Sequence, residues 1–214
     1  VIDDGSTDAT RDVIAATLDR LDREFPVRFL TQPNAGVCAT LNRGLSIAKG
    51  PFVQFLASDD AYLPDKTSAC MAALLDQPQD VAAVYCDGYV MNAQGRTAYR
   101  FSDIYPVPVS RNVHAELLVA NWIPAMGLTL RRDVVDRVGL FDANLKFEDW
   151  DLLLRLSRQH KLARIKGCHF LYRLHDTNLH ANHSVMAAST QTMGAKYPEL
   201  GSFLALKAAW MDRK

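Results

Sequence analysis

The sequence predicts an α/β fold, in which a mixed and mostly parallel sheet is covered by helices on both faces. The chain has 214 residues, of which 49% are hydrophobic and 22% charged, enough for a domain with a buried core. Residues 1–60 follow a β-α-β-α-β order, which is typical of parallel sheets. The short apolar run Pro51–Leu56, opened by Gly50, indicates a buried strand of such a sheet.

The N-terminal half alternates strands with helices. Val1-Ile2 ends a strand, and a helix is predicted over residues 9–25, with Val13, Ile14, Leu18 and Leu21 on its apolar face. A strand over 27–30 and a helix from Val37 to Gly50 follow. Because the chain opens on a strand end without a Met, we expect it to be a fragment of a longer protein.

The second half adds antiparallel elements. A helix is predicted from Pro64, and a strand over 82–86 precedes a hairpin around Asn92–Gly95. Residues 102–124 are irregular. The remaining predictions are strands at 127–130, 162–165 and 169–174, helices at 132–138 and 148–160, and a helical tail from residue 184.

Charge and cysteine content exclude several classes of protein. Lys plus Arg and Asp plus Glu both number 24, so the basic excess of a general nucleic-acid binder is absent. The four cysteines have no C-x-x-C spacing and are typical of buried, reduced thiols in a cytoplasmic protein. No apolar stretch reaches the roughly 20 residues that span a bilayer.

Two adjacent carboxylates, Asp59 and Asp60, follow the run that begins at Pro51. Ligands of open α/β sheets bind outside the carboxyl ends of the strands, which is where these side chains are expected. Neighbouring negative charges repel each other unless a cation such as a divalent metal joins them. A capped turn before the helix at Pro64 explains the pair equally well.

A second pair, Asp3 and Asp4, also lies between a strand and a helix. Carboxylates at this place can accept hydrogen bonds from a nucleotide base or ribose, although capping of the next turn is the better interpretation of the pair alone. The sequence contains neither G-x-G-x-x-G nor G-x-x-x-x-G-K-[ST]. Any diphosphate would therefore need a metal to hold it.

Three carboxylates, Glu148, Asp149 and Asp151, crowd the start of the predicted helix at 148. They either complement the helix dipole or include a general base for a hydroxyl group. Trp150 is either a core residue, the better interpretation, or a platform for a sugar ring. The adjacent Arg131 and Arg132 either pair with phosphates or, more commonly, form a solvated face.

Three histidines, His175, His180 and His183, lie near the end of the last predicted strand. Their H-x4-H-x2-H spacing is a poor match to a zinc site. His175 alone could complete an oxygen-rich Mn²⁺ site, and an ordinary surface or core histidine explains it equally well.

These segments, in this order, resemble glycosyltransferase family 2, whose members have the GT-A fold. The matching segments are Val1-Ile2-Asp3-Asp4-Gly5-Ser6-Thr7-Asp8, Asn34-Ala35-Gly36-Val37 with Asn42-Arg43-Gly44-Leu45, Ser58-Asp59-Asp60, Val138-Gly139-Leu140-Phe141-Asp142 with Glu148-Asp149-Trp150-Asp151-Leu152, and Tyr172-Arg173-Leu174-His175. Two positions depart from the family pattern: Ser58 begins the D-x-D element, and Leu41 stands where many members have Arg.

The resemblance implies a GT-A three-layer α/β/α sandwich over residues 1–183, with a nucleotide-sugar half (1–101) and an acceptor half (102–183), followed by a helical tail (184–214). It also implies that the first strand and helix of the family fold are missing. It also implies residue roles. Asp149, with Glu148 beside it, would be the catalytic base; Asp3, Asp4, Asn34 and Asp59 would bind the nucleotide sugar; and Asp60 and His175 would bind the metal.

The implied activity is inverting transfer of a sugar from a nucleoside-diphosphate sugar, expected to be a UDP-sugar, to an acceptor hydroxyl, with Mn²⁺ or Mg²⁺ as cofactor. The expected acceptor is a carbohydrate or glycolipid. The protein itself is expected in the cytoplasm or in peripheral association with the inner face of a membrane. Two alternatives stay open: a nucleotide-sugar-binding fragment without catalysis, and a sugar-phosphate nucleotidyltransferase.

Overall fold

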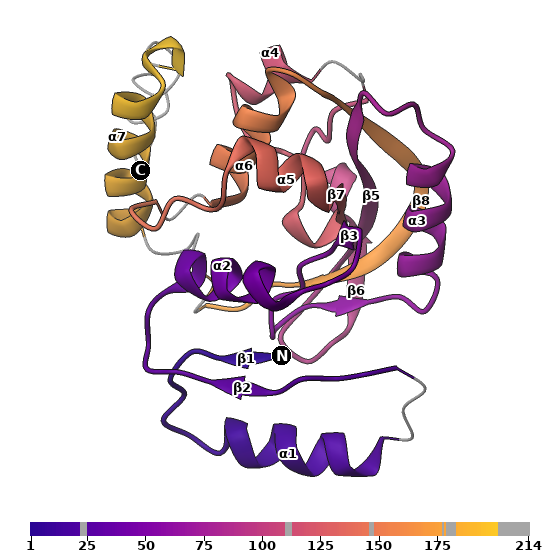
Figure 1. Cartoon of the computed structure of the whole chain (residues 1–214), viewed down its shortest axis with the longest axis vertical. Helices are drawn as coiled ribbons and strands as arrows, with labels where there is room; N and C mark the ends of the chain where they lie inside the picture. Colours follow the sequence, from indigo (N-terminus) through magenta and orange to yellow (C-terminus); the bar gives the residue numbers. More distant parts are fainter. Residues whose placement is uncertain (22–24, 110–112, 146–147, 177, 179–182, 201–214) are drawn as a thin grey trace.

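The computed structural model describes residues 1–21, 25–109, 113–145, 148–176, 178 and 183–200. Its N-terminal part is a small unit in which β1 (Ile2–Asp3) pairs in parallel with β2 (Leu30–Thr31), and α1 (Thr10–Arg20) connects them. Figure 1 shows this unit at one end of the molecule, with α2 (Val37–Ile47) between it and the larger sheet.

The larger sheet has six strands. Its order is β3 (Phe52–Val53), β7 (Leu128–Arg131), β5 (Val81–Met91), β8 (Lys161–Arg173) and β4 (Ala61–Tyr62), and β6 (Thr97–Arg100) also pairs with β5. The sheet is mixed, as expected, but the expectation of a mostly parallel sheet is wrong. Among the described strands four pairs are antiparallel and two, β1–β2 and β5–β8, are parallel.

The run at Pro51–Leu56 contributes only the short β3, which ends one side of the sheet and is antiparallel to β7. Val53 is buried and Phe52 packs against the core, so this edge strand is as apolar as a central one. Apolarity over so few residues does not separate a central strand from a packed edge.

β5 is the centre of the core. Every residue of this strand is buried except Tyr89, as expected when a strand is covered on both faces. The helices α3 (Lys66–Leu75), α4 (His114–Leu117), α5 (Arg132–Val138) and α6 (Glu148–Ser157) add buried side chains to this core.

β8 is one bent strand where two separate strands were predicted. Tyr85 pairs with Arg164 and Asp87 with Cys168, so three residues of β8 lie opposite one of β5. Gly167 within this bulge has a φ of 98°, which is natural only for glycine. Bulges bend a strand, and Figure 1 shows β8 curving across the sheet.

Two interpretations of surface residues are wrong. The apolar face predicted for α1 is not buried: Val13 is 60% exposed and Leu21 51%, because α1 lies beside β1 and β2, outside the main core. The pair Arg131 and Arg132 is no solvated face either. Arg131 donates hydrogen bonds to the carbonyl oxygens of Leu74, Gln77 and Val81, and Arg132 donates to those of Leu45 and Ala48. Most of these carbonyls lie at or near the C-terminal ends of α3 and α2, where cations are stabilised.

The predicted helix of the tail is present as α7 (His183–Lys196), followed by a 3-10 turn at Pro198–Leu200. Met193, Tyr197 and Leu200 are buried, so this segment packs onto the domain beside α6. No helix within the described ranges is both long enough and apolar enough to cross a bilayer.

We predict that Gly88→Ala destabilises the protein by about 1–3 kcal/mol, as overpacked cores do. A Cβ atom at Gly88 would lie 2.4 Å from the ring of Phe170, which is fully buried. The control is Gly44→Ala in α2, where the added Cβ would lie 3.7 Å from Ile2. Chemical denaturation should show that this control is neutral or stabilising by up to about 1 kcal/mol. Equal losses in both variants would contradict the packing described here.

Candidate functional site

The end of β8 holds the acidic turn that contains Asp59 and Asp60. Oδ1 of Asp60 accepts a hydrogen bond of 2.9 Å from the backbone N–H of Arg173. The Nε–H of Arg173 in turn donates to the carbonyl oxygen of Asp59, at 2.8 Å. The turn is therefore fixed to a strand 113 residues further along the chain.

His175 is also brought to this turn. Its Nε2 lies 3.0 Å from Oδ2 of Asp59, and the amide of Asn178 donates to the same oxygen at 3.4 Å. Oδ1 of Asn178 accepts from the backbone N–H of His175 at 2.7 Å, which orients the loop after β8. The structure thus brings Asp59, Asp60 and His175 together.

The donor set suits a divalent cation that is shared with a ligand. Among the described residues no group of three or more His, Cys, Asp or Glu side chains is arranged to hold a metal ion by itself. Cations such as Mg²⁺ are, however, commonly bound by one or two carboxylates together with substrate phosphates. The oxygens of Asp59 and Asp60 fit that arrangement, with the imidazole of His175 beside them.

The electrostatics of Asp60 favour a positive ligand. Burial raises the pKa of Asp60 to about 6, and the charge of Asp59 adds to this shift, while the hydrogen bond from the Arg173 backbone opposes it. The ionised form of such a carboxylate is stabilised when a cation binds beside it.

Asp149 lies at the first turn of α6. Its Oδ2 accepts a hydrogen bond of 2.9 Å from the amide of Asn121, and its Oδ1 accepts one of 2.7 Å from the backbone N–H of Trp150. Burial raises the pKa of Asp149, which is only partly exposed. Glu148, the first residue of α6, is also partly exposed. A carboxylate with a raised pKa is better suited to accept a proton near neutral pH.

Tyr172 directly precedes Arg173, whose backbone N–H binds Asp60. Burial raises the pKa of the Tyr172 phenol, and Tyr105 and the charges of Asp60, Asp59 and Asp149 raise it further.

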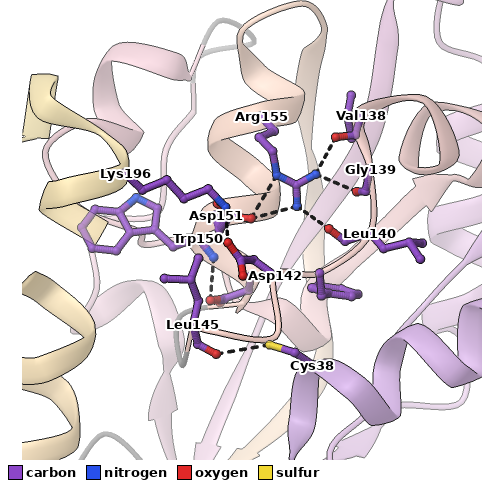
Figure 2. Close-up of polar contacts among 12 residues, drawn as sticks. Cys38, Val138, Gly139, Leu140, Asp142, Leu145, Trp150, Asp151, Arg155 and Lys196 are labelled. Atoms are coloured by element: carbon purple, nitrogen blue, oxygen red, sulfur yellow. Dashed lines mark hydrogen bonds and ion pairs between the residues drawn. The ribbon is translucent and has the colours of Figure 1, made fainter. Parts of the chain in front are cut away.

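Asp151, two residues after Asp149, is fully buried and joins three helices (Figure 2). Its Oδ1 accepts from Nζ of Lys196 at 2.7 Å and from the hydroxyl of Tyr197 at 2.6 Å. Its Oδ2 pairs with Arg155 at 2.9 Å. α6 is thereby joined to α7 and, through Arg155, to α5.

Arg155 and Lys196 extend this network to the loop after α5. Arg155 donates to the carbonyl oxygens of Val138, Gly139 and Leu140, at 2.7, 2.6 and 3.0 Å (Figure 2). Lys196 also donates to Oδ2 of Asp142, at 2.7 Å. The network holds the loop before Asp149 as well as the helix after it.

Trp150 is a core residue, which confirms the better interpretation of its position. It is 3% exposed, and its Nε1–H donates to the carbonyl oxygen of Leu117 at 2.7 Å. A buried indole with a satisfied N–H is a usual core arrangement.

Asp4 binds the loop that contains Asn34. Its carboxylate accepts hydrogen bonds from the side chain of Gln32, at 2.7 Å, and from the backbone N–H groups of Ala35 and Gly36, both at 2.9 Å. Burial works against ionisation, but these hydrogen bonds outweigh it and lower the pKa of Asp4. Asn34 packs on Gly5, where a Cβ atom would lie 2.7 Å from the backbone nitrogen of Asn34.

Asp3 stabilises the turn that follows β1. It accepts hydrogen bonds from the backbone N–H of Ser6, at 3.2 Å, and from Nε of Arg11, at 2.7 Å, and these lower its pKa. The side chain of Asp3 is only 1% exposed. This geometry suits the capping interpretation of Asp3.

A cavity of about 620 Å³ lies elsewhere, lined by residues that include Asp87, Arg100 and Arg164. None of its lining residues is a predicted site residue. The candidate site around Asp59 and Asp149 is therefore located by the contacts of its side chains and not by the volume of a cavity.

Sequence reasoning missed three functional positions. Asn121 lies in the irregular segment 102–124 and carries no motif. Arg173 belongs to the segment Tyr172–His175 that resembles the family, but its backbone bond to Asp60 depends on the fold of β8. Asn178 follows that motif, and only the closed loop after β8 brings it to Asp59. His180 lies outside the described residues, as does the side chain of His183.

We predict that the metal-free protein loses part of its stability as pH rises from about 4 to about 6, owing to Asp60. The folded-state pKa of Asp60 is about 6, above the ordinary 3.8, so the folded state binds the proton more tightly over this range. Thermal unfolding in a chelator should show this loss in the wild type relative to Asp60→Asn. A constant difference in melting temperature across pH would contradict the raised pKa of the half-buried Asp60.

Removal of the buried charge at Asp151 should cost about 3–5 kcal/mol, because Asp151→Asn takes from Arg155 and Lys196 the buried negative charge that both contact. The control is Asp133→Asn, which breaks the exposed pair with Arg137, at 2.8 Å, and should change stability by about 0.5 kcal/mol or less. Urea unfolding measures both. A loss of similar size in the two variants would show that the network contributes little.

Comparison with known proteins identifies the family and the fold of this chain. The sequence model of "Glycosyl transferase family 2" matches residues 1–139. An uncharacterized glycosyltransferase of Nostoc sp. is 28% identical over 205 residues, which cover 92% of this chain and 60% of that protein. This chain thus spans less than two thirds of that relative.

Solved structures resemble the fold. The mannosyltransferase PcManGT from Pyrobaculum calidifontis, in complex with GDP-Man and Mn²⁺, matches with a TM-score of 0.68 at 18% identity, over 97% of this chain and 59% of that one. Residues 1–349 of TarS from S. aureus, in complex with UDP-GlcNAc, match with a TM-score of 0.64 at 17% identity, over 95% and 61%. These likenesses confirm the GT-A fold, and the family match shows that the chain belongs to glycosyltransferase family 2.

Proposed function

We propose that this glycosyltransferase moves a sugar from a UDP-sugar to a hydroxyl group of a carbohydrate or glycolipid by a single, inverting displacement assisted by Mn²⁺ or Mg²⁺. One observation carries the proposal: the end of β8 holds two adjacent carboxylates and an imidazole together, with Nε2 of His175 3.0 Å from Oδ2 of Asp59 and the backbone N–H of Arg173 bonded to Asp60. This turn offers a cation site for a diphosphate, and Asp149, oriented by Asn121, offers a base for a hydroxyl. The solved structures that resemble this fold bind GDP-Man with Mn²⁺ and UDP-GlcNAc, which supports a nucleoside-diphosphate sugar as the donor. That its nucleoside is uridine is our proposal.

Asp60 is the proposed ligand of the cation, with His175 as a second ligand to the cation or the diphosphate. Asp59, which lies between them, would contact the ribose or the cation. When bound, the cation would neutralise charge on the leaving diphosphate. The raised pKa of Asp60 fits a carboxyl group that is completed by a positive ligand.

Asp4 is the proposed contact to the nucleotide base. Its Oδ2 accepts a hydrogen bond from the backbone N–H of Gly36, and a carboxylate oxygen with two lone pairs can accept a second one from a ligand N–H. Asn34 lies in the loop that Asp4 orders and would extend this contact. We assign Asp3 to support of the turn, since its side chain is almost wholly buried.

Asp149 is the proposed base, and Glu148 lies beside it. As the acceptor oxygen attacks the anomeric carbon, its proton moves to Asp149, and the bond from that carbon to the diphosphate oxygen breaks with its electron pair on the diphosphate. A single displacement of this kind inverts the configuration and needs one carboxylate on the acceptor side. The amide of Asn121 orients Asp149 for this step.

The family match favours this reaction over nucleotidyl transfer. Binding of a nucleotide sugar without transfer is the second candidate, because this chain spans only part of its relatives. The four cysteines are all free thiols, which fits our proposal of a cytoplasmic location, with the inner face of a membrane open if the acceptor is a glycolipid.

We predict that Asp149→Asn lowers sugar transfer by about 10²–10⁴-fold, the usual contribution of a general base, and leaves UDP binding intact. Asp60→Asn should instead weaken Mn²⁺-dependent UDP binding. Release of nucleoside diphosphate from a panel of UDP- and GDP-sugars with Mn²⁺ measures turnover, and calorimetric titration measures binding. Asp133→Asn, on the exposed face of α5, is the control.

Wild-type turnover in Asp149→Asn would contradict the assignment of the base. Binding of UDP with Mn²⁺, but no release from any donor by the wild type, would favour the binding fragment.

A further inference from the structure

Four aromatic side chains form a continuous row beside the proposed site. The rings of Trp122 and Tyr105 are stacked, with centroids 5.8 Å apart and planes at 27°. Tyr105 contacts Phe101 at 4.4 Å, and Phe101 contacts Tyr172 edge to face at 5.7 Å. The row therefore runs from the irregular segment 102–124 to the phenol on which the three carboxylates act.

The outer end of this row adjoins the proposed base. Trp122 directly follows Asn121, whose amide donates to Oδ2 of Asp149 at 2.9 Å. Oδ1 of Asn121 accepts from the backbone N–H of Ile123 at 3.0 Å, so the backbone on both sides of Trp122 is held. An aromatic ring and the oriented carboxylate are thus presented by the same short loop.

Three rings of the row can meet a ligand. Phe101 is 8% exposed, whereas Trp122, Tyr105 and Tyr172 are partly exposed. Trp150, the other tryptophan of the described site, is buried and bonded to Leu117. Of the partly exposed rings, Trp122 is the one that adjoins in sequence the residue that binds Asp149.

We propose that Trp122, supported by Tyr105, is the platform on which a sugar ring of the acceptor stacks, so that the acceptor is a saccharide. This inference rests on the proposed function and names the substrate class of its acceptor side. A pyranose ring has an apolar C–H face and polar edges. The C–H face packs on an aromatic ring, and an edge hydroxyl then points to the nearby carboxylate.

The arrangement favours a saccharide over an acyl chain or a peptide. Ligand sites combine aromatic surface with a few placed polar groups, and here the flat ring pair includes the neighbour in sequence of Asn121, whose amide binds Asp149. An acyl chain would use the ring but leave these polar groups without a partner, which costs free energy.

The test compares Trp122→Ala, Trp122→Phe and the control Val119→Ala, an exposed residue of the same segment. The acceptors are a panel of oligosaccharides, a glycerolipid and a serine peptide, each with the donor that the wild type uses. We expect Trp122→Ala to raise the KM for an oligosaccharide by up to about tenfold, the size of an aromatic contact. Trp122→Phe should restore most of the affinity, and Val119→Ala should match the wild type.

A second measurement separates this role from a general effect on the fold. Mn²⁺-dependent UDP binding and the slow hydrolysis of the donor without acceptor should be unchanged in Trp122→Ala. Loss of both with the alanine variant would overturn the inference in favour of a structural role for Trp122.

The outcomes also separate this inference from the proposed function. Transfer to oligosaccharides with an unchanged KM in Trp122→Ala would overturn the platform alone, as would transfer only to the glycerolipid or the peptide. Absence of transfer from every donor to every acceptor by the wild type would overturn the proposed function and the platform with it.

Discussion

The parallel pairing of β5 with β8 is the constraint on which the site depends. β5 is buried in the core, and β8 follows it from Lys161 to Arg173, bending at the bulge around Gly167. The backbone at the end of β8 then binds Asp60, and the loop that follows places His175 against Asp59. The acidic turn has little regular structure of its own, so its geometry comes from the core through β8.

The carboxylates of this protein fall into two groups that serve different purposes. Asp3 and Asp4 are well supplied with hydrogen bonds that lower their pKa, and they shape the loops near β1. Burial instead raises the pKa of Asp60 and Asp149. Groups that are costly to ionise in the free protein are suited to bind a cation or accept a proton. Asp151 differs from both, since three donors fix its charge inside the helix network.

The elements could be predicted where local patterns determine them. The helix before Gly139, the hairpin around Asn92 and the segment order of the family were readable from the sequence. The edge position of β3 was not, since a short apolar run looks alike at the edge and in the centre. Asn121 and the carbonyl bonds of Arg131 were also hidden, because they join residues far apart in the chain. The motif residues around Asp59 could be named, but their mutual contacts depend on the bend of β8.

The site that we propose has one cation-binding turn and one base, so the reaction that we propose is a single displacement. The stereochemistry of the product tests this most directly. The donor that the protein uses has a known anomeric configuration, and proton NMR of the transferred sugar, through the anomeric coupling constant, reports the configuration of the new bond. The account predicts inversion at the anomeric carbon in the first product formed. Retention would contradict it, because two displacements or a different mechanism would then be required.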